Sequence, residues 1–109
     1  VDLPQTAMTP KINRRLVSGE KIMVVELTLA KGGIVAEHSH PHEQMTHVLS
    51  GRLEFDVQGE KRVLGRGEVA HLPPDVPHGA RALEDSVTLE VFSPPREDFL
   101  SGKKADYMK

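Results

Sequence analysis

The chain contains no cysteine and no tryptophan, and aromatic residues make up only 4% of its 109 residues. The absence of cysteine excludes disulfide bonds and thiol chemistry. No apolar run approaches the roughly 20 residues that a membrane-spanning helix needs. No basic block interleaved with aromatic residues marks a surface for nucleic acid. We therefore expect neither a membrane nor a nucleic acid as a partner.

The remaining composition is typical of a soluble globular protein. Hydrophobic residues account for 38% of the chain and charged residues for 28%, with a net charge of -2. A chain of this length can bury one modest core. We predict a single domain over residues 1–109, with its core at about 20–93 and a C-terminal tail at 94–109. No signal peptide is visible at the N-terminal end, so a cytoplasmic location is expected.

Alternation of apolar and polar residues predicts a series of short strands. The predicted strands span residues 21–30, 34–40, 44–50, 52–57, 61–64, 68–72, 79–83 and 86–92. Residues 12–17 could form another strand, paired within the chain or across a dimer. Residues 94–100 could start one short helix, and the polar residues 103–109 are expected to form a frayed tail. Turn signals at such regular spacing predict an all-β antiparallel sandwich or barrel.

Three histidines and one glutamine fall at spacings that suit a metal site. His38 and His40 are two residues apart, so on an extended strand both rings leave the same face. Gln44 begins the next apolar run, and His78 follows a proline-rich corner whose backbone is stiff. Imidazole nitrogen and amide oxygen are ligands for divalent transition metals. We predict that His38, His40, Gln44 and His78 bind one divalent metal ion, with Zn, Ni, Mn and Fe(II) left open.

The predicted ligand set carries no negative charge. It leaves the +2 charge of the metal uncompensated, which favours Lewis-acid chemistry. Dioxygenase chemistry is less favoured, because the common iron oxygenase triad contains a carboxylate that this set lacks. The other histidines do not fall at ligand positions and are expected to be ordinary surface or half-buried strand residues; they are His42, His47 and His71.

Two longer patterns resemble the two motifs of the cupin family. Gly-x5-His-x-His-x3-Gln-x6-Gly runs from Gly32 to Gly51, and Gly-x5-Pro-x4-His runs from Gly67 to His78. The resemblance implies the cupin double-stranded β-helix, an antiparallel jelly-roll barrel. Gln44 stands where most cupins have Glu, and Asp75 stands where the second motif usually has Gly.

Three strings narrow the resemblance to the KdgF group of pectin-degradation cupins: residues 38–44, residues 73–79, and Val-Phe-Ser-Pro-Pro-Arg-Glu-Asp-Phe-Leu at 91–100. Members of that group open an unsaturated uronate monosaccharide from pectin or alginate into its linear keto form. Their metal ligands match the four residues named above. The resemblance further implies catalytic roles for Glu90 (where the group has Asp), Phe92 and Arg96. Arg96 would capture the sugar carboxylate through a bidentate contact.

The resemblance therefore predicts a metal-dependent enzyme, of the isomerase or lyase type, that opens the ring of a small-molecule unsaturated uronate. One alternative is a metal-dependent dioxygenase acting on a small organic substrate, because Glu43 adjoins the site in sequence. Another is a non-catalytic cupin that binds a small molecule or sugar. Sheet edges and the N-terminal segment lead us to expect a homodimer.

Overall fold

The structure is a computed structural model that describes residues 6–100 of the chain, so the predicted tail at 103–109 lies outside the described residues. Ten strands precede one short helix. They are β1 (Thr6–Thr9), β2 (Ile12–Ser18), β3 (Met23–Leu29), β4 (Ile34–His38), β5 (Glu43–Ser50), β6 (Arg52–Val57), β7 (Glu60–Gly65), β8 (Val69–Leu72), β9 (His78–Ala82), β10 (Ser86–Ser93) and α1 (Glu97–Leu100). Within residues 6–100, no helix has the length and apolar character needed to cross a bilayer.

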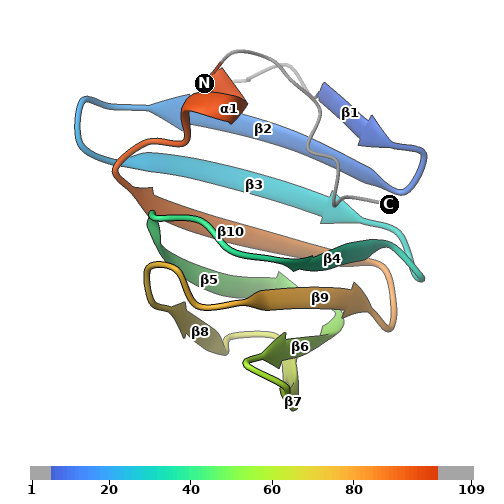
Figure 1. Cartoon of the computed structure of the whole chain (residues 1–109). Coiled ribbons are helices and arrows are strands. Elements are labelled where there is room, and N and C mark those ends of the chain that lie inside the picture. The colour runs from blue at the N-terminus through green and yellow to red at the C-terminus, as the bar shows by residue number, and fades with distance from the viewer. Residues whose placement is uncertain (1–5, 101–109) are drawn as a thin grey trace.

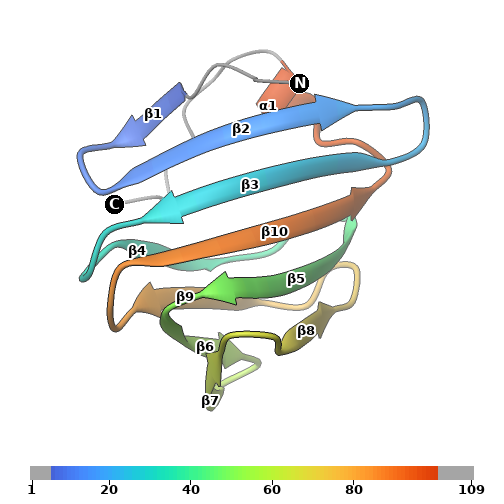
Figure 2. The same ribbon diagram turned by 180° about the vertical axis from the view of Figure 1, so that it is seen from behind.

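The strands form two antiparallel sheets that face each other (Figure 1). The larger sheet has the order β1-β2-β3-β10-β5-β8, and the smaller has the order β4-β9-β6-β7. Figure 2 shows the larger sheet from its outer side, with β4 and β9 behind it. The chain alternates between the sheets at its turns, as in a jelly roll. The predicted all-β fold is confirmed, and each predicted strand is present with its ends shifted by a few residues.

The segment that the sequence left ambiguous, residues 12–17, pairs within the chain. It forms β2, which is hydrogen-bonded to both β1 and β3. The predicted helix is also present, as the single turn α1. In Figures 1 and 2, α1 lies on the inner side of β2, on the same side as the smaller sheet. The helix therefore covers part of the space between the sheets.

The core lies between the two sheets and follows the alternation of the strands. On β3, Val25, Leu27 and Leu29 point inward and are at most 3% exposed. Ile12 of β2 and Phe99 of α1, both outside the predicted core range of 20–93, join the same hydrophobic cluster. The barrel thus has an apolar interior, within which the buried polar residues described next are exceptions.

Candidate functional site

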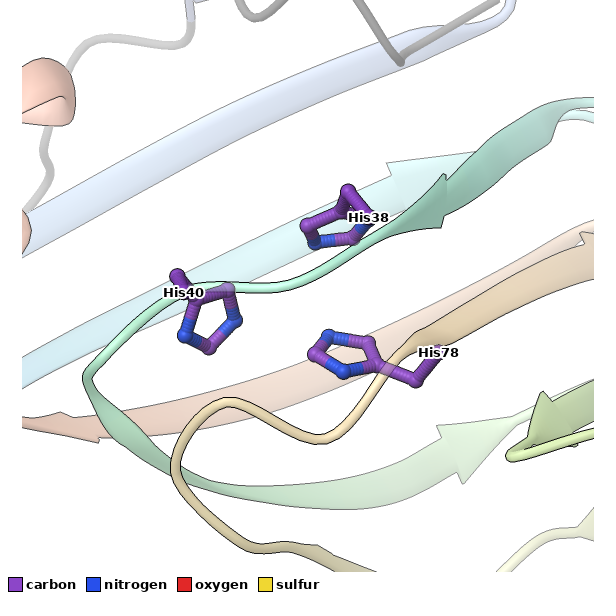
Figure 3. Close-up of side chains that lie close together, drawn as sticks. All are labelled: His38, His40 and His78. Atoms are coloured by element: carbon purple, nitrogen blue, oxygen red, sulfur yellow. The ribbon is translucent and has the colours of Figure 1, made fainter.

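Three histidine rings face one another beside the turn that follows β4, as Figure 3 shows. His38 ends β4 and pairs in register with His78, the first residue of β9, and His40 follows β4 in the next turn. The ring centroid of His78 lies 4.5 Å from that of His38 and 4.9 Å from that of His40. One nitrogen from each of the three rings lies within 4.8 Å of the others. The first and second sequence motifs therefore converge on one point.

The three rings are held in the same tautomer by the main chain. Each Nδ1 contacts a backbone carbonyl oxygen two residues away, and because a carbonyl can only accept, each Nδ1 carries the proton. The acceptors are Ala36 for His38, His42 for His40 and Val76 for His78, at 2.9, 3.0 and 2.8 Å. In a neutral ring this leaves the lone pair on Nε2, which is the arrangement of a metal-binding histidine.

Burial keeps these rings uncharged. Desolvation lowers the pKa of His38 to about 4 and that of His40 to about 4, with the neighbouring positive charge of Arg96 also lowering the pKa of both. The pKa of His78 is lowered by desolvation as well. All three rings are consequently neutral at pH 7, with Nε2 available to a cation.

Gln44 brings its amide oxygen to the same point. Its Oε1 lies 3.0 Å from Nε2 of His40. The orientation of the amide is fixed from the other side, because its Nε2 donates to Thr46 Oγ1 at 2.9 Å and to Glu90 Oε2 at 2.6 Å. Thr46 was not singled out from the sequence, although its position two residues after Gln44 places both side chains on the same face of β5.

The polar atoms of this cluster fit a metal ion. A neutral His40 has one ring proton, yet both of its nitrogens face oxygen acceptors. Nε2 of His78 is buried and has no hydrogen-bond partner among the residues that the structure describes. A divalent cation held by the Nε2 lone pairs of His40 and His78 and by the amide oxygen of Gln44 would satisfy both groups. The donor set, neutral imidazoles and an amide oxygen, suits a divalent transition metal.

Glu90 lies beside this cluster on the inner face of β10 and is 8% exposed. Desolvation raises the pKa of Glu90 to about 7, against the opposing effects of the Thr46 hydroxyl, 3.3 Å away, and of the charge on Arg96. A carboxyl group with this pKa can both give and take a proton near neutral pH. Phe92, two residues along the same strand, is 1% exposed and also faces inward.

Arg96 is buried over the aromatic rings and paired with a carboxylate. Its guanidinium carbon lies 5.2 Å from the centroid of Phe92 and 4.3 Å from that of Phe99. Its Nε and Nη2 donate to the two carboxylate oxygens of Asp98 at 3.0 and 2.7 Å. The edge formed by Nε and Nη2 therefore engages Asp98 here, whereas the resemblance implied a bidentate contact between Arg96 and a substrate carboxylate. Asp98 and Phe99 were not singled out from the sequence.

One cavity joins these groups. The predicted site residues that line it are His38, Gln44, His78, Glu90, Phe92 and Arg96. His40 joins the cluster through its contacts with Gln44 and His78. The deeper walls of the cavity are aliphatic side chains of the core, such as Leu27 and Leu53. The arrangement places the three-histidine cluster, a carboxyl group and a guanidinium around a single space.

The other histidines lie outside the three-ring cluster. His71 is on the surface, where its Nε2 lies 2.8 Å from a carboxylate oxygen of Glu43. The Glu43 carboxylate, next to Gln44 in sequence, thus points to the outer surface of the sheet. The His42 ring lies 5.4 Å from that of His40 but is not part of the three-ring cluster.

Asp75 takes the conformation for which the second motif usually has Gly. Its φ is 64°, in the left-handed region that Asp tolerates better than most residues. In this conformation its backbone N–H donates to the carbonyl of His40 at 2.8 Å. That bond ties the loop before His78 to the turn that carries His40.

Comparison with known proteins agrees with this architecture. Residues 25–93 match the cupin domain family. This chain belongs to the cupin family. The family and the group of three histidines together suggest a divalent metal.

Relatives of this cupin match nearly its whole length and support the resemblance to KdgF. The pectin degradation protein KdgF of Dickeya dadantii (strain 3937) is 34% identical over 102 residues, covering 91% of this chain and 93% of the relative. The structure of KdgF from Halomonas sp. superposes with a TM-score of 0.85 at 33% identity, covering 88% and 90% of the two chains. An RmlC-like cupin from Shewanella frigidimarina gives a TM-score of 0.86 at 30% identity, covering 89% and 88%.

Proposed function

We propose that this cupin is a metal-dependent pectin-degradation enzyme that converts unsaturated uronate monosaccharides, derived from pectin or alginate, to the linear keto form. The observation that carries the proposal is the convergence of the three-histidine cluster, Glu90 and Arg96 on one cavity. The similarity to KdgF over nearly the whole chain supports the choice of substrate.

We assign the metal to His38, His40, Gln44 and His78. A divalent cation held there would supply Lewis-acid polarisation of a sugar oxygen. Arg96 would bind the sugar carboxylate, since a guanidinium suits this group, and it approaches from the wall that also carries Phe92. Phe92 would form an apolar wall against the sugar ring and help to exclude water.

Glu90 would move the proton. In the reaction, the anomeric hydroxyl loses its proton while the bond between the anomeric carbon and the ring oxygen breaks. Breaking this bond leaves an enolate on the former ring oxygen, and the enolate becomes a ketone when a proton is added to the adjacent carbon of its C=C bond. One proton is removed and one is added, so the reaction is an isomerisation. A carboxyl group with a pKa of about 7 suits both transfers.

The two alternatives are weaker on structural grounds. The dioxygenase hypothesis relied on Glu43, whose carboxylate contacts His71 on the outer surface. Oxygen consumption by the Fe(II)-loaded protein would revive that hypothesis. A non-catalytic sugar-binding role leaves the raised pKa of Glu90, beside the metal cluster, without a use.

Loss of the conjugated enol-ether absorbance of an unsaturated galacturonate and of its alginate counterpart tests the proposal directly. The metal-loaded protein should turn over at least one of them. Glu90→Gln, nearly isosteric, should lower kcat by about 100-fold to 10,000-fold without releasing the metal. Glu26→Gln, on the outer face of β3 and paired with Arg15, is the matched control and should leave the rate unchanged. Undiminished turnover by Glu90→Gln would exclude the carboxyl group from the reaction.

A further inference from the structure

We propose that Asp98 is a positioning residue that holds the Arg96 guanidinium in the orientation needed to receive a substrate carboxylate. The inference rests on the proposed function, because it assumes that Arg96 binds the carboxylate of a sugar acid. It also gives α1 a role in the site, since Asp98 lies in the first turn of that helix.

The guanidinium of Arg96 is constrained on several sides. The carboxylate of Asp98 accepts hydrogen bonds from Nε and Nη2, and these two bonds prevent rotation of the guanidinium within its plane. The rings of Phe92 and Phe99 lie within 5.2 Å of its carbon, and they restrict the tilt of that plane. The side chain is 5% exposed, whereas that of Asp98 is 43% exposed. Asp98 thus holds Arg96 from the solvent side while Arg96 lines the cavity.

Stability alone is a poor explanation for this pair. The Asp98 carboxylate is 43% exposed, so water on its side screens the pair and limits what the pair adds to the free energy of folding, although Arg96 itself is buried. The pair can contribute more by orienting Arg96. An arginine side chain has many rotamers, and restricting them on binding costs conformational entropy. A pre-oriented guanidinium lets the substrate avoid that cost.

The same geometry admits an opposite interpretation, in which Asp98 competes with the substrate for Arg96. The two interpretations predict opposite signs. If Asp98 positions Arg96, then Asp98→Asn should raise KM for the unsaturated uronate by about tenfold to 100-fold, with a smaller effect on kcat. If Asp98 competes, the same change should lower KM, and this result would overturn the proposal.

Glu97→Gln is the matched control, because it removes the same charge one residue away on the exposed surface of α1. It should leave KM unchanged. An equal rise of KM in Glu97→Gln would show that the effect is not specific to Asp98 and would overturn the proposal, because loss of a negative charge by itself favours an anionic substrate. Asp98→Glu keeps the carboxylate and should recover part of the affinity. Circular dichroism of each variant checks that it is folded.

A double-mutant cycle tests whether Asp98 acts through Arg96. Asp98→Asn should raise KM in the wild-type background and have no further effect in Arg96→Gln. Additive effects would overturn the proposal.

Calorimetry with galacturonate, a non-reacting sugar acid, and with galactose separates this inference from the proposed function. If Asp98→Asn lowers the affinity for galacturonate but not that for galactose, the result supports the positioning role even if the uronate is not turned over. An unchanged galacturonate affinity contradicts the role even if the uronate is turned over.

Discussion

At the scale of single residues, the main chain and the apolar core organise the histidine cluster. Main-chain carbonyls fix the protons on Nδ1, and burial lowers the pKa values of the rings so that they stay neutral. Placing polar groups in an apolar barrel is unfavourable unless they find partners. The Nε2 lone pairs of the cluster are therefore costly to bury unless a partner such as a cation takes them.

Replacing His78 tests this arrangement directly. His78→Ala removes the ring that lies closest to both other histidines, so metal affinity should fall by more than about 100-fold, since even outer-shell partners contribute 10-fold to 100-fold. Elemental analysis of protein purified without added metal should then find far less than one ion per chain. His71→Ala, which removes a surface ring paired with Glu43, is the control and should keep the metal. Equal metal content in both variants would contradict the assigned site.

Spacing in the sequence predicted which histidines lie together, although β4 ends at His38 and His40 lies in the turn after it, not on a strand shared with His38. It could not identify Thr46 or Asp98, whose importance depends on partners brought close only by the fold: Glu90 for Thr46, and the buried setting of Arg96 for Asp98. The positive φ of Asp75 was not predicted, although the Gly that the second motif usually has at this position agrees with it.

At the scale of secondary-structure elements, a β-bulge turns His38 inward. Val35 pairs with Ala80 and His38 pairs with His78, so two residues of β4 oppose the single residue Gly79 of β9. Val35 and His38 are three apart and would leave opposite faces of a regular strand, yet both line the cavity. The extra residue on β4 shifts the alternation of its side chains by one position, so that Val35 and His38 face the same side. Bulges are common near functional sites, where they redirect a side chain. Alternation within the sequence could not reveal it, because a bulge depends on the partner strand.

Gly79 makes room for this bulge. A Cβ at position 79 would lie 2.8 Å from the carbonyl oxygen of Val35 and 3.1 Å from the backbone nitrogen of Glu37. Gly79→Ala should therefore displace the bulge together with the Ala36 carbonyl that orients His38. We expect metal affinity to fall by about 10-fold to 100-fold and the free energy of unfolding to fall by about 1–3 kcal/mol. Metal titration and thermal unfolding measure the two effects.

Gly65→Ala is the control for this prediction, because its Cβ would have no neighbour closer than 3.8 Å. It should change neither quantity appreciably. Unchanged metal affinity in a folded Gly79→Ala protein would show that the bulge does not set the position of His38.

At the scale of the whole molecule, the site depends on how the two sheets are held together. Gly51 lies where the chain passes from β5 of the larger sheet to β6 of the smaller sheet. The return passage, from β9 to β10, lies against it at Asp85 and Ser86. Arg52 next to this crossing accepts, through its carbonyl oxygen, a hydrogen bond from the Leu83 backbone at 2.9 Å. The two crossings thus close one end of the barrel, and they hold β5 and β10, which carry Gln44 and Glu90, in place against the smaller sheet.

Comparing two glycines with the same backbone conformation tests this closure. Gly51 and Gly67 have φ of 83° and 87°, in the left-handed region. Ala in this conformation costs about 1–2 kcal/mol, and the cost is similar at the two positions. Only at Gly51 would the new methyl group overlap Ser86 and the Asp85 carbonyl oxygen, whereas nothing lies within 4 Å at Gly67. Gly51→Ala should therefore lower the free energy of unfolding by about 2–5 kcal/mol, and Gly67→Ala by only the left-handed penalty of about 1–2 kcal/mol. Urea denaturation of the two variants measures the difference, and equal losses would mean that the crossing is loosely packed and does not hold the sheets together.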